Sequence, residues 1–489
     1  MQQHDIYERA RLSRDVRFDG QFFVGVQTTG IYCRPVCPAV APKSENVTFY
    51  PSAAAASEAG FRPCLRCRPE CAPGTPAWNG TSTTVRRGLR LISNGALDDG
   101  SIEQLADRLG VTSRHLRRLF TQHLGASPLA VAHTQRLHFA KRLIDQTSLP
   151  MSHIAVASGF GSVRRFNDAF RKTYQRTPRE LRRHNDEAFD EGSALTVRLG
   201  CSQPFDWGAM LDFLTGRATP GVEQVVADSY LRTVAVDGQS GAIECRFDHD
   251  KGQVILLLHG IGTTQLFPVV QRVREMLDLD APTPLIGEVL QSDDRLAALV
   301  RRQPGIRVPG AWYGFELTVR AILGQQVSVK AATTLAGRIA GQYGEQVALP
   351  ASLRSRGNFA LGKLFPTPEK LARARFNNIG LTGSRAETIR QLARAFVKGD
   401  IEFDPSQDPA GFCERLTAIK GIGDWTAEYV AMRALKNPDA FPASDLGLLK
   451  AMGDEVAGAT ELRQRAESWR PWRAYAALLL WGSLPGSGG

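Results

Sequence analysis

The sequence lacks any long apolar run. Charged side chains interrupt every hydrophobic stretch before it reaches the roughly 18 residues that a membrane-spanning helix needs. The first residues also lack the basic and then apolar pattern of a secretion signal. Cysteine is scarce as well: there are eight among 489 residues, too few for a disulfide scaffold. We therefore expect a chain that has no membrane partner and works in the reducing cytoplasm.

Acidic residues are scarce in the front part of the chain. Residues 1–186 hold 27 Lys and Arg but only 15 Asp and Glu, a net charge of +12. The remaining residues hold 33 basic and 34 acidic side chains, a net charge of −1. A strongly basic segment indicates a polyanionic partner. We expect the front of the chain to bind nucleic acid, which would associate the protein with the nucleoid.

The chain is too long for a single domain. Two stretches are typical of linkers: 73–82, which is rich in Gly, Pro, Thr and Ser, and the acidic segment 186–193. The residues that separate these linkers have an almost entirely helical pattern.

Beyond the second linker, the pattern predicts a small α+β domain followed by a helical one. One helix is predicted over 206–216, and alternation of apolar residues marks several strands. The predicted strands are 195–200, 230–236, 242–247 and 253–258. From about residue 287 onward the pattern is helical again. The expected domains are 1–75, 84–185, 194–300 and 301–486.

Four of the cysteines form two tight pairs near the start of the chain, Cys33 with Cys37 and Cys64 with Cys67. This spacing is typical of a structural zinc site, and from spacing alone a purely structural role is favoured. A chemical role, in which one cysteine is a nucleophile, stays open as the alternative. Four thiolates around one Zn²⁺ carry a formal charge of −2, and such electron-rich sulfur can attack an electrophilic methyl group.

The residues around the cysteines resemble the N-terminal domain of the Ada family of methylation-response proteins. The matching segments are 17–22, 28–33, 45–50 and 60–67. The resemblance implies that Cys33 accepts a methyl group from a methylphosphotriester in DNA. It also implies that Cys37, Cys64 and Cys67 complete the zinc shell, and that Arg62 and Arg66 lie near the DNA backbone. The sequence departs from relatives at 38–40, where Pro-Ala-Val stands in place of further arginines.

Residues 101–120 have the pattern of a helix-turn-helix. A capped helix ends at a glycine turn, and a second helix begins after Thr112. Apolar residues of the second helix share one face, which leaves its arginines to point outward. Such a helix suits a major groove. The pattern recurs over 154–172, and two tandem copies in a basic segment favour DNA binding over a merely solvated face.

This stretch resembles the AraC family of regulators, down to residues 176–182. The resemblance implies that each recognition helix enters one of two successive major grooves. We expect contacts to bases or phosphates from Arg114, Arg117, Arg118, Arg164, Arg165 and Asn167.

A glycine hairpin and an acidic residue stand out in the near-neutral part of the chain. Gly421 and Gly423 permit a tight turn whose backbone N–H groups can bind a phosphate at the start of a helix. Asp445 follows 22 positions after Gly423. Taken alone, the glycines are weak evidence of function, and a lone Asp in this setting is more often a helix cap.

Together these features resemble the helix-hairpin-helix superfamily of DNA glycosylases, in particular its AlkA branch. The matching segments are 205–211, 225–230, 304–310, 321–328 and 470–476. The resemblance implies that Asp445 is the catalytic carboxylate. Trp425, Tyr429 and Trp472 are the candidates to stack on a flipped cationic base, with Trp481 a weaker one. For each of them, plain core packing is the alternative.

The resemblance also bears on details of the reaction. Relatives with lyase activity carry a lysine where this chain has Trp425, which predicts hydrolysis of the N-glycosidic bond without strand cleavage. Gln326 occupies the position of a side chain that fills the gap left by the flipped base. The carbonyls of Thr417, Ile419 and Ile422 match positions where relatives hold a monovalent cation.

The sequence thus predicts a multidomain fold: a small zinc-bound α/β module, an all-α double helix-turn-helix, an α+β glycosylase N-terminal domain and an all-α helix-hairpin-helix core. The combined hypothesis is a transcription activator, with RNA polymerase and double-stranded DNA as partners, fused to an enzyme that excises alkylated purines such as 3-methyladenine. The alternative is a regulator whose glycosylase half only binds DNA. The methyl-acceptor sequence Pro-Cys-His-Arg is absent, so direct repair of O6-methylguanine is not expected.

Overall fold

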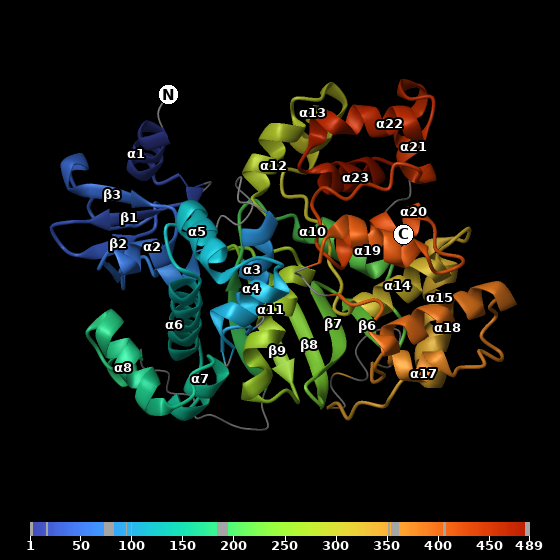
Figure 1. The fold of residues 1–489 in the computed structure, drawn as a ribbon, viewed down its shortest axis with the longest axis horizontal. Coiled ribbons are helices and arrows are strands. Elements are labelled where there is room, and N and C mark those ends of the chain that lie inside the picture. Colours follow the sequence, from blue (N-terminus) through green and yellow to red (C-terminus); the bar gives the residue numbers. More distant parts are fainter. Residues whose placement is uncertain are drawn as a thin grey trace.

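The computed structural model describes residues 3–484 apart from 16–17, 73–82, 94, 99, 183–193, 351–352, 354–360 and 404–406. Both predicted linkers lie outside the described residues. No helix in the described part is long and apolar enough to cross a membrane. Figure 1 follows the chain from the blue N-terminal elements on the left to the red C-terminal helices at the upper right.

The described residues of the N-terminal module form a four-stranded sheet in the order β3-β1-β2-β4. Its elements are α1 (Gln3–Ser13), β1 (Phe23–Val26), β2 (Ile31–Cys33), β3 (Val47–Tyr50), α2 (Ala53–Glu58) and β4 (Arg62–Pro63). Strand β2 runs antiparallel to β1 and parallel to β4. Because β2 ends at Cys33 and β4 leads directly into Cys64, the parallel pairing brings the two cysteine pairs together.

The next module consists of helices in the described part of the chain. They are α3 (Thr83–Ser93), α4 (Ile102–Arg108), α5 (Ser113–Leu124), α6 (Pro128–Gln146), α7 (Met151–Ala157), α8 (Val163–Tyr174) and α9 (Pro178–Leu181). Ser101 and Gln104 form the capping box that starts α4, while Thr112 and Ser162 cap α5 and α8. The predicted double helix-turn-helix is therefore confirmed: α4 with α5, and α7 with α8.

The third module is built on an antiparallel sheet in the order β5-β9-β8-β7-β6, counted over the described residues. Its elements are β5 (Leu195–Gly200), α10 (Trp207–Thr215), β6 (Glu223–Val226), β7 (Ser229–Val236), β8 (Gln239–Asp248), β9 (Gln253–His259) and α11 (Leu266–Met276). All four predicted strands and the predicted helix are present. Strand β6 was not predicted.

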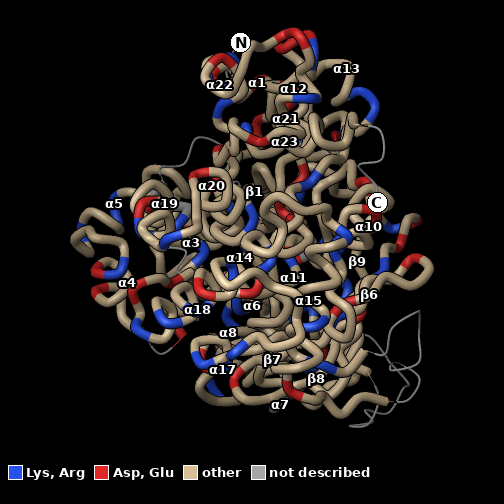
Figure 2. The backbone as a smooth tube through the Cα atoms, turned by 90° about the vertical axis from the view of Figure 1, so that its right-hand side faces the viewer, with Lys and Arg blue, Asp and Glu red and all other residues tan. Residues whose placement is uncertain are grey.

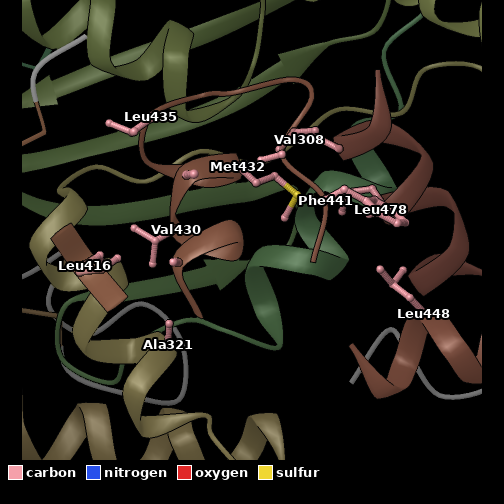
Figure 3. Close-up of a cluster of buried hydrophobic side chains, with 14 of the residues drawn as sticks. Val308, Ala321, Leu416, Val430, Met432, Leu435, Phe441, Leu448 and Leu478 are labelled. Atoms are coloured by element: carbon pink, nitrogen blue, oxygen red, sulfur yellow. The ribbon is translucent and has the colours of Figure 1, made fainter. Parts of the chain in front are cut away.

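The last module is helical. Its helices are α12 (Thr283–Leu290), α13 (Asp294–Arg302), α14 (Gly314–Leu323), α15 (Val329–Tyr343), α17 (Pro368–Ala372), α18 (Gly383–Lys398), α19 (Pro409–Thr417), α20 (Asp424–Arg433), α21 (Leu446–Met452), α22 (Ala459–Arg465) and α23 (Arg473–Gly482). Figure 3 shows how Leu416, Val430 and Leu448, from three of these helices, lie in one buried apolar cluster. Figure 2 shows the side of the molecule on which many of these helices lie, and basic and acidic positions are interspersed there. This agrees with the near-zero net charge of the residues that follow residue 186.

The modules are packed against one another. One buried apolar cluster runs from α6, α7 and α8 into the sheet of the third module, with Phe139 packed edge-to-face on Phe267 at a ring distance of 4.8 Å. The zinc module contacts α6 through Tyr32, whose hydroxyl lies 2.9 Å from Nε2 of His138. Arg68 of the same module pairs with the buried Asp145 at 2.6 Å. The regulatory and glycosylase halves therefore share a packed interface.

Candidate active sites

The four predicted zinc ligands come together. The Sγ atoms of Cys33, Cys37, Cys64 and Cys67 all lie within 4.8 Å of one another. Among the described residues, no other group of three or more His, Cys, Asp or Glu side chains has such an arrangement. Cys64 and Cys67 are buried, with 8% and 7% exposure, while Cys33 and Cys37 are half-buried. Four sulfur donors at this separation fit tetrahedral Zn²⁺.

The thiols of this cluster perturb one another strongly. Hydrogen bonding with Cys37 and Cys64 raises the pKa of Cys33, whereas hydrogen bonding from Cys33 lowers the pKa of Cys37 to about 7. The pKa of Cys64 is lowered for the same reason. Opposite shifts mean that the sulfurs share protons, because four adjacent thiolates repel one another unless a cation neutralises them. The donor set therefore fits a divalent metal ion.

Arg34 braces the cluster. Its backbone N–H donates to Sγ of Cys67 over 3.3 Å, and its guanidinium donates to the carbonyl of Cys67 over 3.2 Å. Asp19 holds this guanidinium from the other side through an Nε–Oδ1 bond of 2.8 Å. The sequence analysis assigned no role to this pair, although both residues lie in or beside the segments that resemble Ada. The backbone N–H donated to Sγ of Cys67 favours the thiolate form of that sulfur.

The predicted DNA-contacting side chains lie mostly on the surface. Arg66 of the zinc module is exposed, and Arg62 donates to Oε1 of Gln175 at the end of α8 over 3.1 Å. The predicted arginines of the two recognition helices are all exposed: Arg114, Arg117 and Arg118 on α5, and Arg164 and Arg165 on α8. Asn167 is half-buried. Arg117 contacts Glu103 over 3.4 Å, an exposed pair that contributes little and competes weakly with phosphate.

Most of the other predicted residues line a cavity of about 1310 Å³. Asp445 lies on its wall, at the start of α21, where its Oδ1 accepts a hydrogen bond from the N–H of Leu448 over 2.9 Å. Two indoles also donate to this carboxylate: Nε1 of Trp425 to Oδ2 over 2.6 Å, and Nε1 of Trp481 to Oδ1 over 2.8 Å. Three donors thus fix the carboxylate on the cavity wall.

Aromatic rings form part of the same wall. Trp425 and Tyr429, one turn apart on α20, stack with ring centroids 5.4 Å apart and planes 9° from parallel. Trp481 of α23 packs edge-to-face on Tyr429 at 6.2 Å. The prediction for Trp472 is wrong. This residue does not line the cavity and is only 2% exposed, because it packs in the core against Tyr475. Trp481, the weaker candidate, takes its place.

The hairpin glycines lie at the mouth of this cavity, between α19 and α20. Gly421 has φ +96°, and Gly423 is the residue that precedes α20. Gln325 ties the loop that follows α14 to this hairpin, with Nε2 donating to the carbonyl of Gly421 over 3.0 Å. Its neighbour Gln326 is exposed on the cavity lining with φ +57°, a conformation that turns its side chain out of the helical path.

Four arginines with no role predicted from the sequence also line the cavity: Arg217, Arg307, Arg320 and Arg433. Arg433 donates to the hydroxyl of Tyr429 over 2.6 Å and to the carbonyls of Pro309 and Gly310. Burial alone would raise the pKa of Tyr429, but Arg433 and Arg217 outweigh burial and lower that pKa. The interaction of Arg217 with Tyr429 could not be predicted from the sequence, because the two residues are far apart in the chain and only the fold brings them together.

Replacing Gly421 by Ala should destabilise the hairpin. A Cβ at this position would lie 2.3 Å from Oγ1 of Thr388, which is itself held by the carbonyls of Ser384 and Lys420. The positive φ adds strain, so we expect a loss of roughly 1–3 kcal/mol in urea unfolding. Gly423→Ala is the matched control, because its Cβ would enter open space. Equal stability of the two variants would contradict the prediction.

Comparison with known proteins covers the whole chain. Residues 7–70 match the family model "Metal binding domain of Ada", and 105–184 match "Helix-turn-helix domain". Residues 196–313 match "AlkA N-terminal domain", and 319–471 match "HhH-GPD superfamily base excision DNA repair protein".

Individual relatives agree with the family models. The chain is 40% identical over 98% of its length, and 97% of the relative's, to the probable bifunctional transcriptional activator/DNA repair enzyme AlkA of Mycobacterium tuberculosis. It is 33% identical to DNA-3-methyladenine glycosylase 2 of Escherichia coli, covering 58% of this chain and 95% of that protein. A solved 3-methyladenine DNA glycosylase from Archaeoglobus fulgidus shares the fold over 58% of this chain and 96% of its own, with a TM-score of 0.50 and 24% identity.

Proposed function

Since the chain belongs to the family of the bifunctional transcriptional activator/DNA repair enzyme AlkA, we propose that it senses methylated DNA, activates repair genes and excises alkylated purines such as 3-methyladenine. One observation carries this proposal: a single chain places a four-sulfur cluster beside two helix-turn-helix pairs, and a hydrogen-bonded carboxylate beside a stacked indole and phenol ring in a cavity.

The sensing step is a methyl transfer to Cys33. Its Sγ attacks the methyl carbon of a methylphosphotriester; the C–S bond forms, the C–O bond breaks, and the phosphodiester anion leaves. Zinc, when bound by the four cysteines, keeps their sulfurs deprotonated and electron-rich at neutral pH. Arg62 and Arg66 hold the neighbouring phosphates. Because Cys33 becomes a thioether that no step reverses, each chain turns over once.

Activation follows from the change in charge. The methylated cluster carries one negative charge fewer, so it repels DNA phosphates less. Binding through α5 and α8, which would enter successive major grooves, then strengthens. The arginines of these helices contact phosphates and bases, and the bound protein recruits RNA polymerase to the repair genes, in the cytoplasm around the nucleoid.

Excision takes place in the cavity. Alkylation at a ring nitrogen leaves the purine cationic, so the base is already a good leaving group. The flipped base stacks on Trp425 and Tyr429, while Asp445 stabilises positive charge on the sugar and orients the attacking water. Gln326 fills the gap left in the duplex, and the N–H groups at Gly421 and Gly423 bind a backbone phosphate.

Two finer features complete the proposal. No lysine lines the cavity in the described part of the chain, and the position of the lyase amine is Trp425, so the bond is hydrolysed without strand cleavage. The carbonyls of Thr417, Ile419 and Ile422 would hold a monovalent cation, which would add positive charge to the phosphate-binding hairpin. The test of both is a gel assay: alkylated duplex incubated with the protein should yield abasic sites and intact strands, with activity that depends on added K⁺.

Zinc content offers an independent prediction. Cys64→Ala should reduce bound zinc from one ion per chain to none, because a buried ligand of the cluster is lost. Cys413→Ala is the matched control: this cysteine is half-buried and lies in α19, away from the cluster. Metal analysis by plasma mass spectrometry measures both. A full zinc complement in the Cys64 variant would contradict the four-sulfur assignment.

A further inference from the structure

One arginine of the regulatory half contacts the glycosylase half directly. Arg90 of α3 donates from Nη1 to the carbonyl of Leu435 and from Nη2 to the carbonyl of Lys436, the latter over 2.9 Å. These carbonyls follow directly after α20, the helix that carries Trp425 and Tyr429. Both carbonyls lie just beyond the C-cap residue Ala434, and a guanidinium is well suited to bind two neighbouring carbonyls at once.

Other contacts also hold the segment that follows α20. The ammonium of Lys436 donates to the carbonyl of Val308 over 2.7 Å and pairs with Asp278 at 3.2 Å. Lys436 has φ +54°, so the chain turns sharply here. Burial lowers the pKa of Arg90, while the carboxylates of Glu275 and Asp278 oppose this shift. Arg90 thus lies among polar groups that are shielded from water, and removing its hydrogen bonds there should cost free energy.

The opposite face of α3 supports a recognition helix. A Cβ on Gly88 would lie 2.9 Å from the ring of Phe120, which is fully buried on α5. Gly88 and Arg90 are two residues apart, roughly 200° around a helix, so they point to opposite sides of α3. A single helix therefore packs on the first recognition helix with one face and binds the end of the base-stacking helix with the other.

We propose that Arg90 is a positioning residue for base excision: it fixes the C-terminal end of α20, and with it the stacking surface of Trp425 and Tyr429. The regulatory half thereby holds the base cavity in its working geometry. The inference rests on the proposed glycosylase activity.

The test is Arg90→Met in the full-length protein, which keeps the length of the side chain and removes the donors. We expect single-turnover release of 3-methyladenine to slow about tenfold, because small misplacements of a stacked base are costly. Affinity for the alkylated duplex should stay within about twofold, since the hairpin and Gln326 are untouched. Arg90→Lys, which retains a charged donor, should recover part of the rate.

Arg136→Met is the matched control, because Arg136 binds the carbonyl of Leu97 and the carboxylate of Asp98 within the regulatory half alone. It should unfold at a lower temperature but release bases at the normal rate. A folded Arg90→Met protein with normal release would overturn the inference, as would an equal loss in the Arg136 variant. Should Arg90→Met not fold, Arg90→Gln, which cannot reach both carbonyls with a guanidinium, replaces it, and a normal release rate in that folded variant overturns the inference. Absence of release by the unaltered protein defeats the proposed function itself.

Discussion

Replacing Asp445 by Asn should reduce the release of 3-methyladenine by roughly 10²–10³-fold. The carboxylate stands on the cavity wall with both oxygens held by indole N–H groups, so its negative charge faces the place where positive charge develops on the sugar. Asn has the same shape and also serves as a helix cap, so α21 should still form. The change removes charge while leaving most of the geometry in place.

Single-turnover assays on duplex DNA treated with a methylating agent measure this effect. Asp408→Asn is the control: Asp408 caps α19 in the same helical module, through a bond of 2.9 Å to the N–H of Gly411, and does not line the cavity. Its release rate should match that of the unaltered protein. If the unaltered protein releases no base, the glycosylase half only binds DNA and the alternative hypothesis holds. If both proteins release bases at the same rate, the half is active but Asp445 is not its catalytic carboxylate.

Periodicity was sufficient to predict most of the fold. The strands of the third module alternate clearly enough for β5, β7, β8 and β9 to be located from the sequence, and side-chain caps mark the starts of α4 and α5. Strand β6 spans only Glu223–Val226, and four residues are too few for alternation to distinguish a strand from a loop.

The cavity wall shows what the sequence leaves undetermined. Trp472 lies immediately before the first residue of α23, and Trp481 lies near the end of that helix. Both are aromatic residues in a segment that resembles the glycosylases or just beyond it, so the sequence offers both as candidates and does not show which one lines the cavity. The structure decides for Trp481, because the ring of Trp472 fills the core beside Tyr475. The hydrogen bonds from two indoles to Asp445 likewise require distant segments to be placed together.

The packing between modules is the part that sequence analysis missed altogether. Arg90 lies in a basic helical segment and would ordinarily be assigned to DNA or solvent. Its carbonyl acceptors follow α20, more than 300 residues later in the chain. No local pattern encodes such a pair, so the sequence predicts four modules in a row where the structure has a shared core.

Replacing Cys33 by Ser should reduce methyl transfer from DNA methylphosphotriesters to background. The structure narrows the choice of nucleophile to Cys33 and Cys37, because Cys64 and Cys67 are buried. A serine hydroxyl is not ionised at neutral pH and binds zinc weakly, so the electron-rich sulfur is lost with little change in volume. Excision of alkylated bases should continue, since none of the four cysteines of the cluster lines the cavity that holds Asp445.

Mass spectrometry of peptides from the protein incubated with methylated DNA is the decisive measurement. In the expected product, the mass of the Cys33 residue is higher by one methylene unit and the side-chain sulfur of Cys37 is unmodified. Cys413→Ser serves as the control and should be methylated at Cys33 to the normal extent. Methylation of Cys37 instead would show that this other half-buried sulfur is the nucleophile. A zinc-loaded protein with both sulfurs unmodified would make the cluster purely structural, and the proposed change of charge would then have no source.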